Sequence, residues 1–167
     1  MSQATLRIAL GADHGALELK NALVAHLTAK GYEVKDFGTN TAESCNYADY
    51  ANLVARNVAD GTFDLGFLAC TSGIGMAIAA NRHRHVRAAN VRSIEEAQTT
   101  RQHNNTNVLT FSGKETSAEQ AIATIPPESS VDEVSYARQA RARGLPLLGQ
   151  QDIALQEIDA ASRMLIA

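Results

Sequence analysis

Residues 66–75 read Gly-Phe-Leu-Ala-Cys-Thr-Ser-Gly-Ile-Gly, an apolar run that ends in a cysteine and passes into a loop of small residues. A short apolar run bounded in this way is typical of a buried strand. The helical pattern that follows over residues 73–81 is expected to point its free backbone N–H groups back at the loop. Because parallel strands bind ligands at their carboxyl ends, this stretch predicts a site for a negatively charged group at Cys70.

The pattern of a short strand followed by a helix recurs along the chain. Strands are expected over residues 6–11, 33–37, 65–70, 86–91 and 108–111, and helices over residues 16–29, 49–59, 73–81, 93–102 and 117–125. Right-handed crossovers between parallel strands place helices on both faces of a sheet. The sequence therefore predicts an α/β fold with a doubly wound, Rossmann-like, five-stranded parallel sheet.

A C-terminal helical extension is expected after this core. Pro126-Pro127 ends the core, and helical patterns follow over residues 132–143 and 152–166. The last pattern carries an apolar stripe that must be buried on its own core or on a second subunit, and we favour the subunit. We expect one domain over residues 1–167, with the core in 1–125 and the extension in 126–167, assembled as a homodimer or homotetramer.

Composition narrows the class of protein. The 167 residues are 45% hydrophobic with a formal net charge of −3, which offers no basic field for nucleic acid. No apolar run approaches the ~18 residues of a membrane span, and the start of the sequence has no signal-peptide pattern. The two cysteines, Cys45 and Cys70, lie in different contexts and fit a reducing compartment. We expect a cytoplasmic protein without nucleic-acid or membrane partners.

Cys70 is the leading candidate for chemistry. The small residues after it, 71–75, are typical of a nest of backbone amides that binds an anion or stabilises a thiolate. A buried structural cysteine is the alternative. The lone Gly-x-Gly is too short for a dinucleotide fingerprint, and no Gly-Lys-Ser/Thr phosphate loop is present.

Three further clusters lie at expected element ends: Gly-Ala-Asp-His-Gly at 11–15, Asn-Tyr-Ala-Asp-Tyr at 46–50 and Arg-Gln-His-Asn-Asn-Thr-Asn at 101–107. Asp13 and His14 either face a ligand or form a turn in which Asp13 caps a helix. Tyr47 either offers a phenol to the same sheet edge or packs. His103 is suited to proton transfer, or it belongs to a capping turn with its neighbouring asparagines.

Metal and hydrolase chemistry find less support. His83 and His85 lie in a basic turn without nearby carboxylates or thiols, so no metal site is expected. A Ser-His-Asp hydrolase lacks its Gly-x-Ser-x-Gly elbow. A thiol hydrolase or transferase that uses Cys70 and His103 stays open from residue type alone.

Taken in order, the four motifs resemble the ribose-5-phosphate isomerase B family, which also includes the galactose-6-phosphate isomerase subunits. The resemblance runs from Leu6 to Phe111. It implies reversible conversion of a phosphorylated aldose to a ketose, typically ribose 5-phosphate to ribulose 5-phosphate of the pentose phosphate pathway, without metal or organic cofactor. A site at a subunit interface is also implied.

The resemblance also implies roles for individual residues. Cys70 is the base that moves the proton between C1 and C2, and the amides of Thr71, Ser72, Gly73, Ile74 and Gly75 form an oxyanion hole. His103 protonates the ring oxygen, with Asp13 and Tyr47 assisting at the hydroxyls. His14 contacts the phosphate, and Asn104 contacts the sugar.

Departures from the family pattern concern the substrate. Thr71 stands where the family usually has glycine, which predicts a stiffer or narrower loop, and Lys114 stands where an arginine is expected. The family's phosphate-binding Gly-Gly-Arg-His-x-x-Arg segment is not recognisable. Its nearest candidates are Arg138, Arg141 and Arg143, whose alternative role is a solvated helix face. A four- or six-carbon sugar phosphate and a non-catalytic sugar-phosphate sensor are therefore kept as alternatives.

Overall fold

The computed structural model describes residues 5–125. Its strands are β1 (Arg7–Ala12), β2 (Glu33–Asp36), β3 (Leu65–Cys70), β4 (Ala88–Asn90) and β5 (Val108–Ser112). Its helices are α1 (Leu17–Ala29), α2 (Tyr47–Ala59), α3 (Ile74–Ala80), α4 (Ile94–Asn104) and α5 (Ala118–Ala123), with a 3-10 turn η1 (His14–Ala16) before α1. Every element expected in this range is present, with its ends shifted by at most two residues. The helices expected over 132–143 and 152–166 lie outside the described residues.

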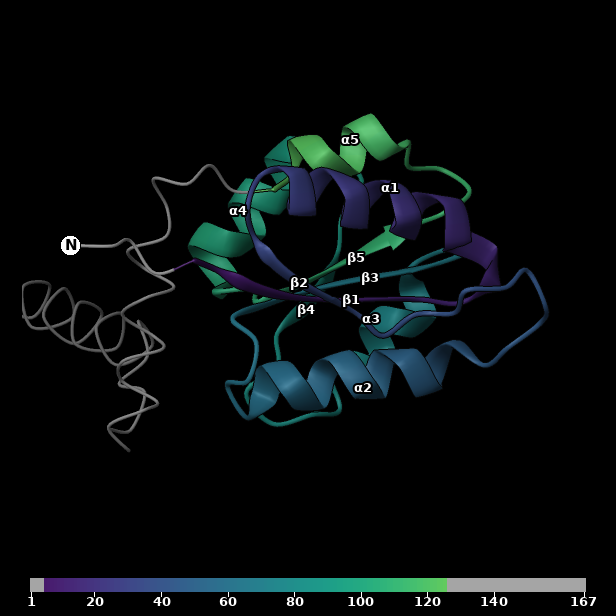
Figure 1. Cartoon of the computed structure of the whole chain (residues 1–167). Coiled ribbons are helices and arrows are strands. Elements are labelled where there is room, and N and C mark those ends of the chain that lie inside the picture. The colour runs from purple at the N-terminus through teal and green to yellow at the C-terminus, as the bar shows by residue number, and fades with distance from the viewer. Residues whose placement is uncertain (1–4, 126–167) are drawn as a thin grey trace, which may run out of the picture. The chain divides into compact units, whose positions relative to one another are not determined.

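The strands form one parallel sheet in the order β2-β1-β3-β5-β4. Figure 1 shows α1, α4 and α5 on one face of the sheet and α2 and α3 on the other. Two hydrophobic clusters match this arrangement, one on each face. The predicted doubly wound α/β sheet is therefore confirmed for the described residues.

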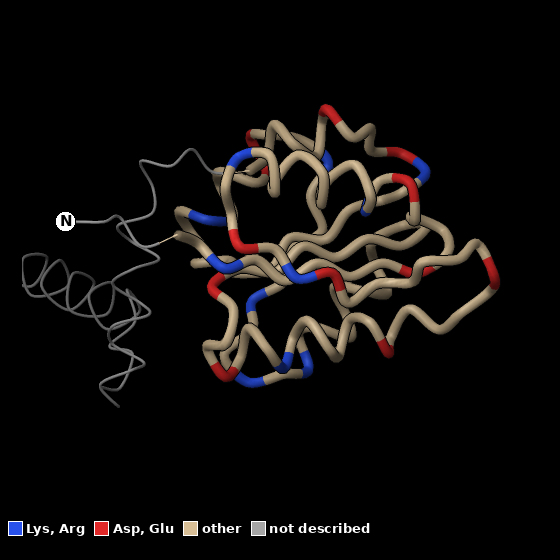
Figure 2. Tube along the Cα trace, viewed as in Figure 1, with Lys and Arg blue, Asp and Glu red and all other residues tan. Residues whose placement is uncertain are grey.

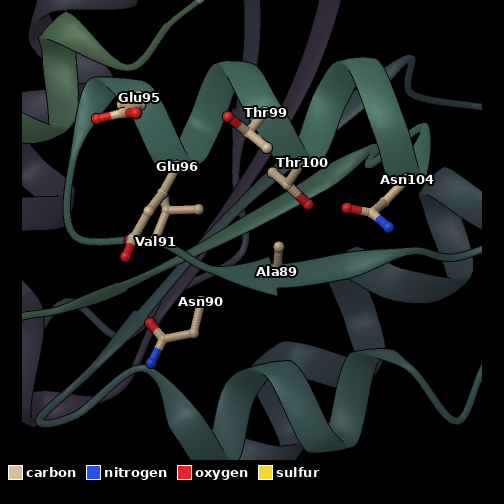
Figure 3. Close-up of a pocket in the computed structure, with 8 residues that line it drawn as sticks. All are labelled: Ala89, Asn90, Val91, Glu95, Glu96, Thr99, Thr100 and Asn104. Carbon is tan, nitrogen blue, oxygen red and sulfur yellow. The ribbon is translucent and has the colours of Figure 1, made fainter.

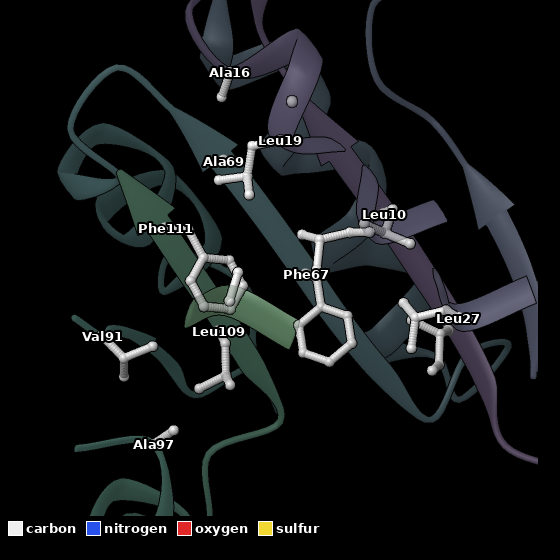
Figure 4. Packing of buried hydrophobic residues seen from close by; sticks show 14 residues of the cluster. Leu10, Ala16, Leu19, Leu27, Phe67, Ala69, Val91, Ala97, Leu109 and Phe111 are labelled. Atoms are coloured by element: carbon white, nitrogen blue, oxygen red, sulfur yellow. The ribbon is translucent and has the colours of Figure 1, made fainter. Parts of the chain in front are cut away.

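The central strand β3 is buried along its whole length. On one face, Phe67 packs beside Phe111 of β5 with ring centroids 6.1 Å apart, inside the cluster drawn in Figure 4. On the other face, a Cβ added to Gly66 would lie 2.8 Å from Val54 and 3.0 Å from Val108. Such close packing holds β3 firmly, so the residue at its carboxyl end has a fixed position.

The two edges of the sheet carry different loops. Gly66 pairs with Val108 near the amino edge, and Cys70 pairs with Ser112 at the carboxyl edge. At about 3.3 Å per residue, the four steps from Gly66 to Cys70 separate the two edges by about 13 Å. The loops after β1, β3 and β5 meet at the carboxyl edge, whereas α4 runs back and ends at the amino edge, where β5 begins.

Candidate active site

Cys70 is the last residue of β3 and is only 5% exposed. Its Sγ accepts a hydrogen bond from the Gly73 N–H at 3.2 Å. Gly73 adopts φ +75°, and a Cβ there would lie 2.5 Å from Asn90 Oδ1 and 2.8 Å from the Phe111 carbonyl. Glycine is therefore required both by the left-handed backbone and by the lack of space. The turn thus aims a backbone donor at the Cys70 sulfur.

The loop after β1 packs directly against the Cys70 loop. The Asp13 N–H donates to the Ala69 carbonyl at 3.3 Å, which joins the ends of β1 and β3. Asp13 is buried, and its Oδ1 accepts from the Gly15 N–H at 2.9 Å, so it caps η1 as one sequence interpretation proposed. A Cβ on Gly15 would lie 2.3 Å from Thr71 Oγ1. Asp13 thus lies next to the Cys70 loop while one of its oxygens holds the turn.

His14 is exposed and is oriented by the loop after β2. Its Nδ1 accepts from the Cys45 N–H at 3.2 Å and lies 3.7 Å from Cys45 Sγ. In the neutral ring the proton then resides on Nε2, which becomes a donor. A hydrogen bond with the Cys45 side chain raises the pKa of Tyr50, against the opposing effect of a hydrogen bond with Thr39. The loop around Cys45 is therefore tied both to His14 and to α2.

Tyr47 joins the same edge of the sheet. It is the first residue of α2, which Asn46 caps by accepting from the Ala48 N–H at 3.1 Å. A Cβ on Gly75 would lie 2.8 Å from the Tyr47 ring, so the ring lies against the first turn of α3. Tyr47 as a whole is 41% exposed, although its ring lies beside the helix that follows the Cys70 loop.

The loop after β5 completes the carboxyl edge. The Gly113 N–H donates to the Cys70 carbonyl at 2.8 Å, and the Lys114 N–H donates to the Thr71 carbonyl at 3.4 Å. The structure therefore brings ten predicted site residues to one edge: Asp13, His14, Tyr47, Cys70, Thr71, Ser72, Gly73, Ile74, Gly75 and Lys114. Arg138 and Arg141 lie outside the described residues.

His103 and Asn104 are not at this edge. They end α4, and Arg87 Nη1 donates to the Asn104 carbonyl at 3.2 Å beside the start of β4. A cavity of about 350 Å³ lies between α4 and β4. Figure 3 shows the residues that line it, with Asn104 near one end and Asn90 near the other. Within one chain, His103 is therefore separated from Cys70 by about the length of β5, roughly 13 Å.

Three polar side chains that sequence reasoning missed hold the Cys70 loop. Ser112 Oγ donates to the Thr71 carbonyl at 2.8 Å, Asn90 Nδ2 to the Ser72 carbonyl at 3.2 Å and Thr110 Oγ1 to the Gly73 carbonyl at 3.0 Å. Thr110 and Ser112 are buried on alternate positions of β5. The signal in the sequence that could have identified Thr110 and Ser112 is the presence of two polar residues at alternate positions of the otherwise apolar strand β5.

Within residues 5–125, no three His, Cys, Asp or Glu side chains come together as they do around a metal ion. His83 instead pairs its Nε2 with Asn52 Oδ1 at 2.8 Å. None of the described helices combines the length and apolar character that a bilayer crossing needs. Basic and acidic residues are interspersed along the chain trace in Figure 2.

Comparisons with known proteins agree with the fold. The model of the Ribose/Galactose Isomerase family matches residues 8–126. Ribose-5-phosphate isomerase B of Escherichia coli is 45% identical over 108 residues, covering 65% of this chain and 72% of that protein. D-erythrulose-4-phosphate isomerase of Pectobacterium atrosepticum is 38% identical over 110 residues, with the same shares covered.

Solved structures give the same result. A ribose 5-phosphate isomerase of Thermotoga maritima superposes with a TM-score of 0.73 at 35% identity, covering 94% of this chain and 99% of that one. Ribose-5-phosphate isomerase B of Mycoplasma genitalium, with bound ribulose-5-phosphate, gives 0.70 at 31% identity and covers 95% and 97%. The chain therefore belongs to the ribose/galactose isomerase family and is an aldose–ketose isomerase of a phosphorylated sugar.

Proposed function

We propose that the chain interconverts ribose 5-phosphate and ribulose 5-phosphate through a cis-enediolate, with Cys70 as the base. The observation that carries this proposal is the buried thiol at the end of β3, 3.2 Å from an amide donor and surrounded by a loop of small residues. The E. coli relative and the M. genitalium structure with bound ribulose-5-phosphate support the five-carbon substrate.

The proposed reaction is a proton transfer between two adjacent carbons. The Cys70 thiolate removes the proton from C2 of the open-chain aldose, and the electron pair moves into the enediolate. The thiol then returns the proton to C1, while a proton moves between the two oxygens to give the ketose. Amides of residues 71–75 stabilise the developing oxyanion, apart from those of Gly73 and Ile74, which donate to Cys70 Sγ and Ser72 Oγ. One such donor contributes roughly 3 kcal/mol in comparable sites.

Ring opening requires an acid at the ring oxygen, the role proposed for His103. Because His103 and Asn104 lie at the amino edge of the sheet, a second copy of the chain must supply them to Cys70. Asp13 and Tyr47 assist at the sugar hydroxyls from the first copy. This proposal places each site between two subunits of a homodimer or homotetramer.

The phosphate group is assigned to cationic and donor groups at the carboxyl edge. His14 presents Nε2–H as a donor because its Nδ1 accepts from the Cys45 N–H. Lys114 begins the loop beside Thr71 and adds a point charge, without the planar fork of an arginine. Arg138 and Arg141 remain candidates from the sequence for the rest of the phosphate charge.

A four-carbon substrate is the second candidate, because D-erythrulose-4-phosphate isomerase is 38% identical to this chain. The two substrates differ in the distance between the carbonyl and the phosphate. A pocket that holds one phosphate position well is therefore expected to bind the other poorly.

The test is a coupled isomerase assay of the purified full chain against four-, five- and six-carbon aldose and ketose phosphates. We expect turnover of ribose 5-phosphate, with deuterium from solvent incorporated at C1 of the ribulose 5-phosphate product and, through the reverse reaction, at C2 of ribose 5-phosphate. Cys70→Ala should abolish both turnover and exchange, whereas Cys45→Ala, which removes the other thiol, should still exchange. Wild-type protein that isomerises none of these sugars, or an active Cys70→Ala variant, would contradict the proposal.

A further inference from the structure

Three consecutive carbonyls of the Cys70 loop are each bound by one side chain from a neighbouring strand. Ser112 and Thr110 of β5 bind the carbonyls of Thr71 and Gly73, and Asn90 of β4 binds the carbonyl between them. Carbonyls in this loop therefore point toward the sheet. Because each peptide unit is planar and trans, its N–H points the opposite way.

The middle peptide connects Asn90 to the thiol. Ser72 and Gly73 share one peptide unit, whose carbonyl accepts from Asn90 Nδ2 at 3.2 Å and whose N–H donates to Cys70 Sγ at 3.2 Å. The orientation of that single rigid plane decides whether the thiol has its donor. Asn90 thus acts on the sulfur through one peptide unit, although it does not touch it.

The Ser72–Gly73 peptide needs a hydrogen bond from outside the loop to fix its orientation, because glycine permits it to rotate. Gly73 already adopts φ +75°, and glycine populates positive and negative φ with similar ease. Ser72 is exposed, so its carbonyl can exchange Asn90 for water if the plane turns. Rotation of the plane would turn the N–H away from Cys70.

The oxygen of the Asn90 side-chain amide indicates that the contribution of Asn90 to folding stability does not account for its presence. Asn90 Oδ1 is buried over Gly73 and has no hydrogen-bond partner among the described residues. A buried polar atom without a partner is unfavourable for folding. Figure 3 shows the Asn90 side chain on the side of β4 away from α4, which is the side of the Cys70 loop.

We propose that Asn90 is a positioning residue for the isomerase reaction, which sets the Ser72–Gly73 peptide so that its N–H stabilises the Cys70 thiolate. The inference rests on the proposed role of Cys70 as the base. Neither Asn90 nor its strand supplies a group that contacts the substrate in this proposal.

The test compares Asn90→Leu with the matched control Asn81→Leu. Asn81 also binds backbone with its amide, accepting from the Ala88 N–H at 2.9 Å and donating to the Ala88 carbonyl at 2.8 Å, away from Cys70. Asn90→Leu should lower kcat about tenfold with KM within about twofold, since one hydrogen bond to a charged group is lost. Its Tm should match or exceed that of the wild type. Asn81→Leu should lower Tm and leave kcat unchanged.

A second measurement does not depend on the sugar. Alkylation of Cys70 by iodoacetamide, followed by peptide mass to separate it from Cys45, should be slower in Asn90→Leu and unchanged in Asn81→Leu. A kcat and an alkylation rate equal to those of the wild type in Asn90→Leu would overturn the inference. It would also be overturned if kcat and the alkylation rate fell in both variants in proportion to their loss of Tm. If the wild type isomerises no sugar phosphate, the proposed function fails, and the alkylation rates still decide the role of Asn90.

Discussion

Mixing two inactive variants tests whether the active site is shared between subunits. Cys70→Ala removes the proposed base at the carboxyl edge of the sheet, and His103→Ala removes the proposed acid at the amino edge. Along β5 these edges are about 13 Å apart, too far for both side chains to act on adjacent atoms of one sugar within one chain. We therefore expect each homo-oligomer to be inactive and a mixed oligomer to regain activity.

The size of the recovery follows from symmetry. In a two-fold assembly, each mixed dimer has one site with both changes and one site with neither. Random exchange at equal concentrations makes half of the dimers mixed, so the mixture should reach about one quarter of the wild-type activity. A tetramer in which each site spans one pair of subunits gives the same fraction.

The assay is coupled isomerisation of ribose 5-phosphate after the two variants are unfolded together and refolded, or coexpressed with different tags. A Cys70→Ala and His103→Ala double variant, mixed with wild type, serves as the control for exchange. Efficient subunit exchange without recovered activity would refute the shared site, because a site built within one chain cannot be restored by mixing. Substantial activity of His103→Ala alone would refute its role as the acid.

Three further changes test the packing and the electrostatics of the fold. Gly66→Ala should destabilise the chain by about 1–3 kcal/mol in urea unfolding, because its Cβ meets Val54 and Val108 in the core; unaltered stability would contradict this. Gly15→Ala should lower kcat/KM, because its Cβ would lie 2.3 Å from Thr71 Oγ1, and adding Thr71→Gly should restore kcat/KM. If the double variant is no more active than Gly15→Ala, the contact with Thr71 is not the cause of the loss. Hydrogen bonds from its own backbone N–H and then from Ser117 lower the pKa of Glu119. Its contribution to stability is therefore present above the unfolded-state pKa and lost as pH falls through the folded-state pKa. In Glu119→Gln, the urea concentration at the midpoint of unfolding should therefore depend less on pH in the acid range. An unchanged pH dependence would contradict the role given to Glu119.

The strands could be predicted from the sequence because their apolar character is strong. Residues 65–70 are buried on both faces, as expected for the centre of a parallel sheet covered by helices. Helix ends were also marked, since Ser93 and Ser117 occupy N-cap positions at the starts of α4 and α5. The strand order could not be predicted, because the placement of β5 between β3 and β4 depends on contacts between distant segments.

The carboxyl-edge site could be predicted in outline, since each motif there follows directly after a strand or begins the next helix. The position of His103 required a further step. It lies at the end of a crossover helix, and a crossover helix returns the chain to the amino edge before the next parallel strand. The resemblance to the family gives His103 and Cys70 roles in the same reaction, whereas the topology places the two residues at opposite edges of the sheet.

Asn90 was beyond the reach of the sequence for a different reason. It occurs inside an expected apolar strand, residues 86–91, where one asparagine carries no pattern. Its function arises only from the register that brings the end of β4 beside the Ser72 carbonyl. Side chains that act through a backbone group have no fixed spacing from the catalytic residue, so periodicity and motif arguments do not detect them.

The threonine that replaces the family's usual glycine at position 71 is accommodated by its surroundings. Gly15 leaves the space into which Thr71 Oγ1 fits, and Ser112 holds the Thr71 carbonyl at 2.8 Å. The loop is therefore held from outside at Thr71, while the Gly73 N–H donates to Cys70 Sγ. Among the described residues, the departure from the family pattern that lies where the phosphate is proposed to bind is Lys114, and it is the one expected to bear on substrate choice.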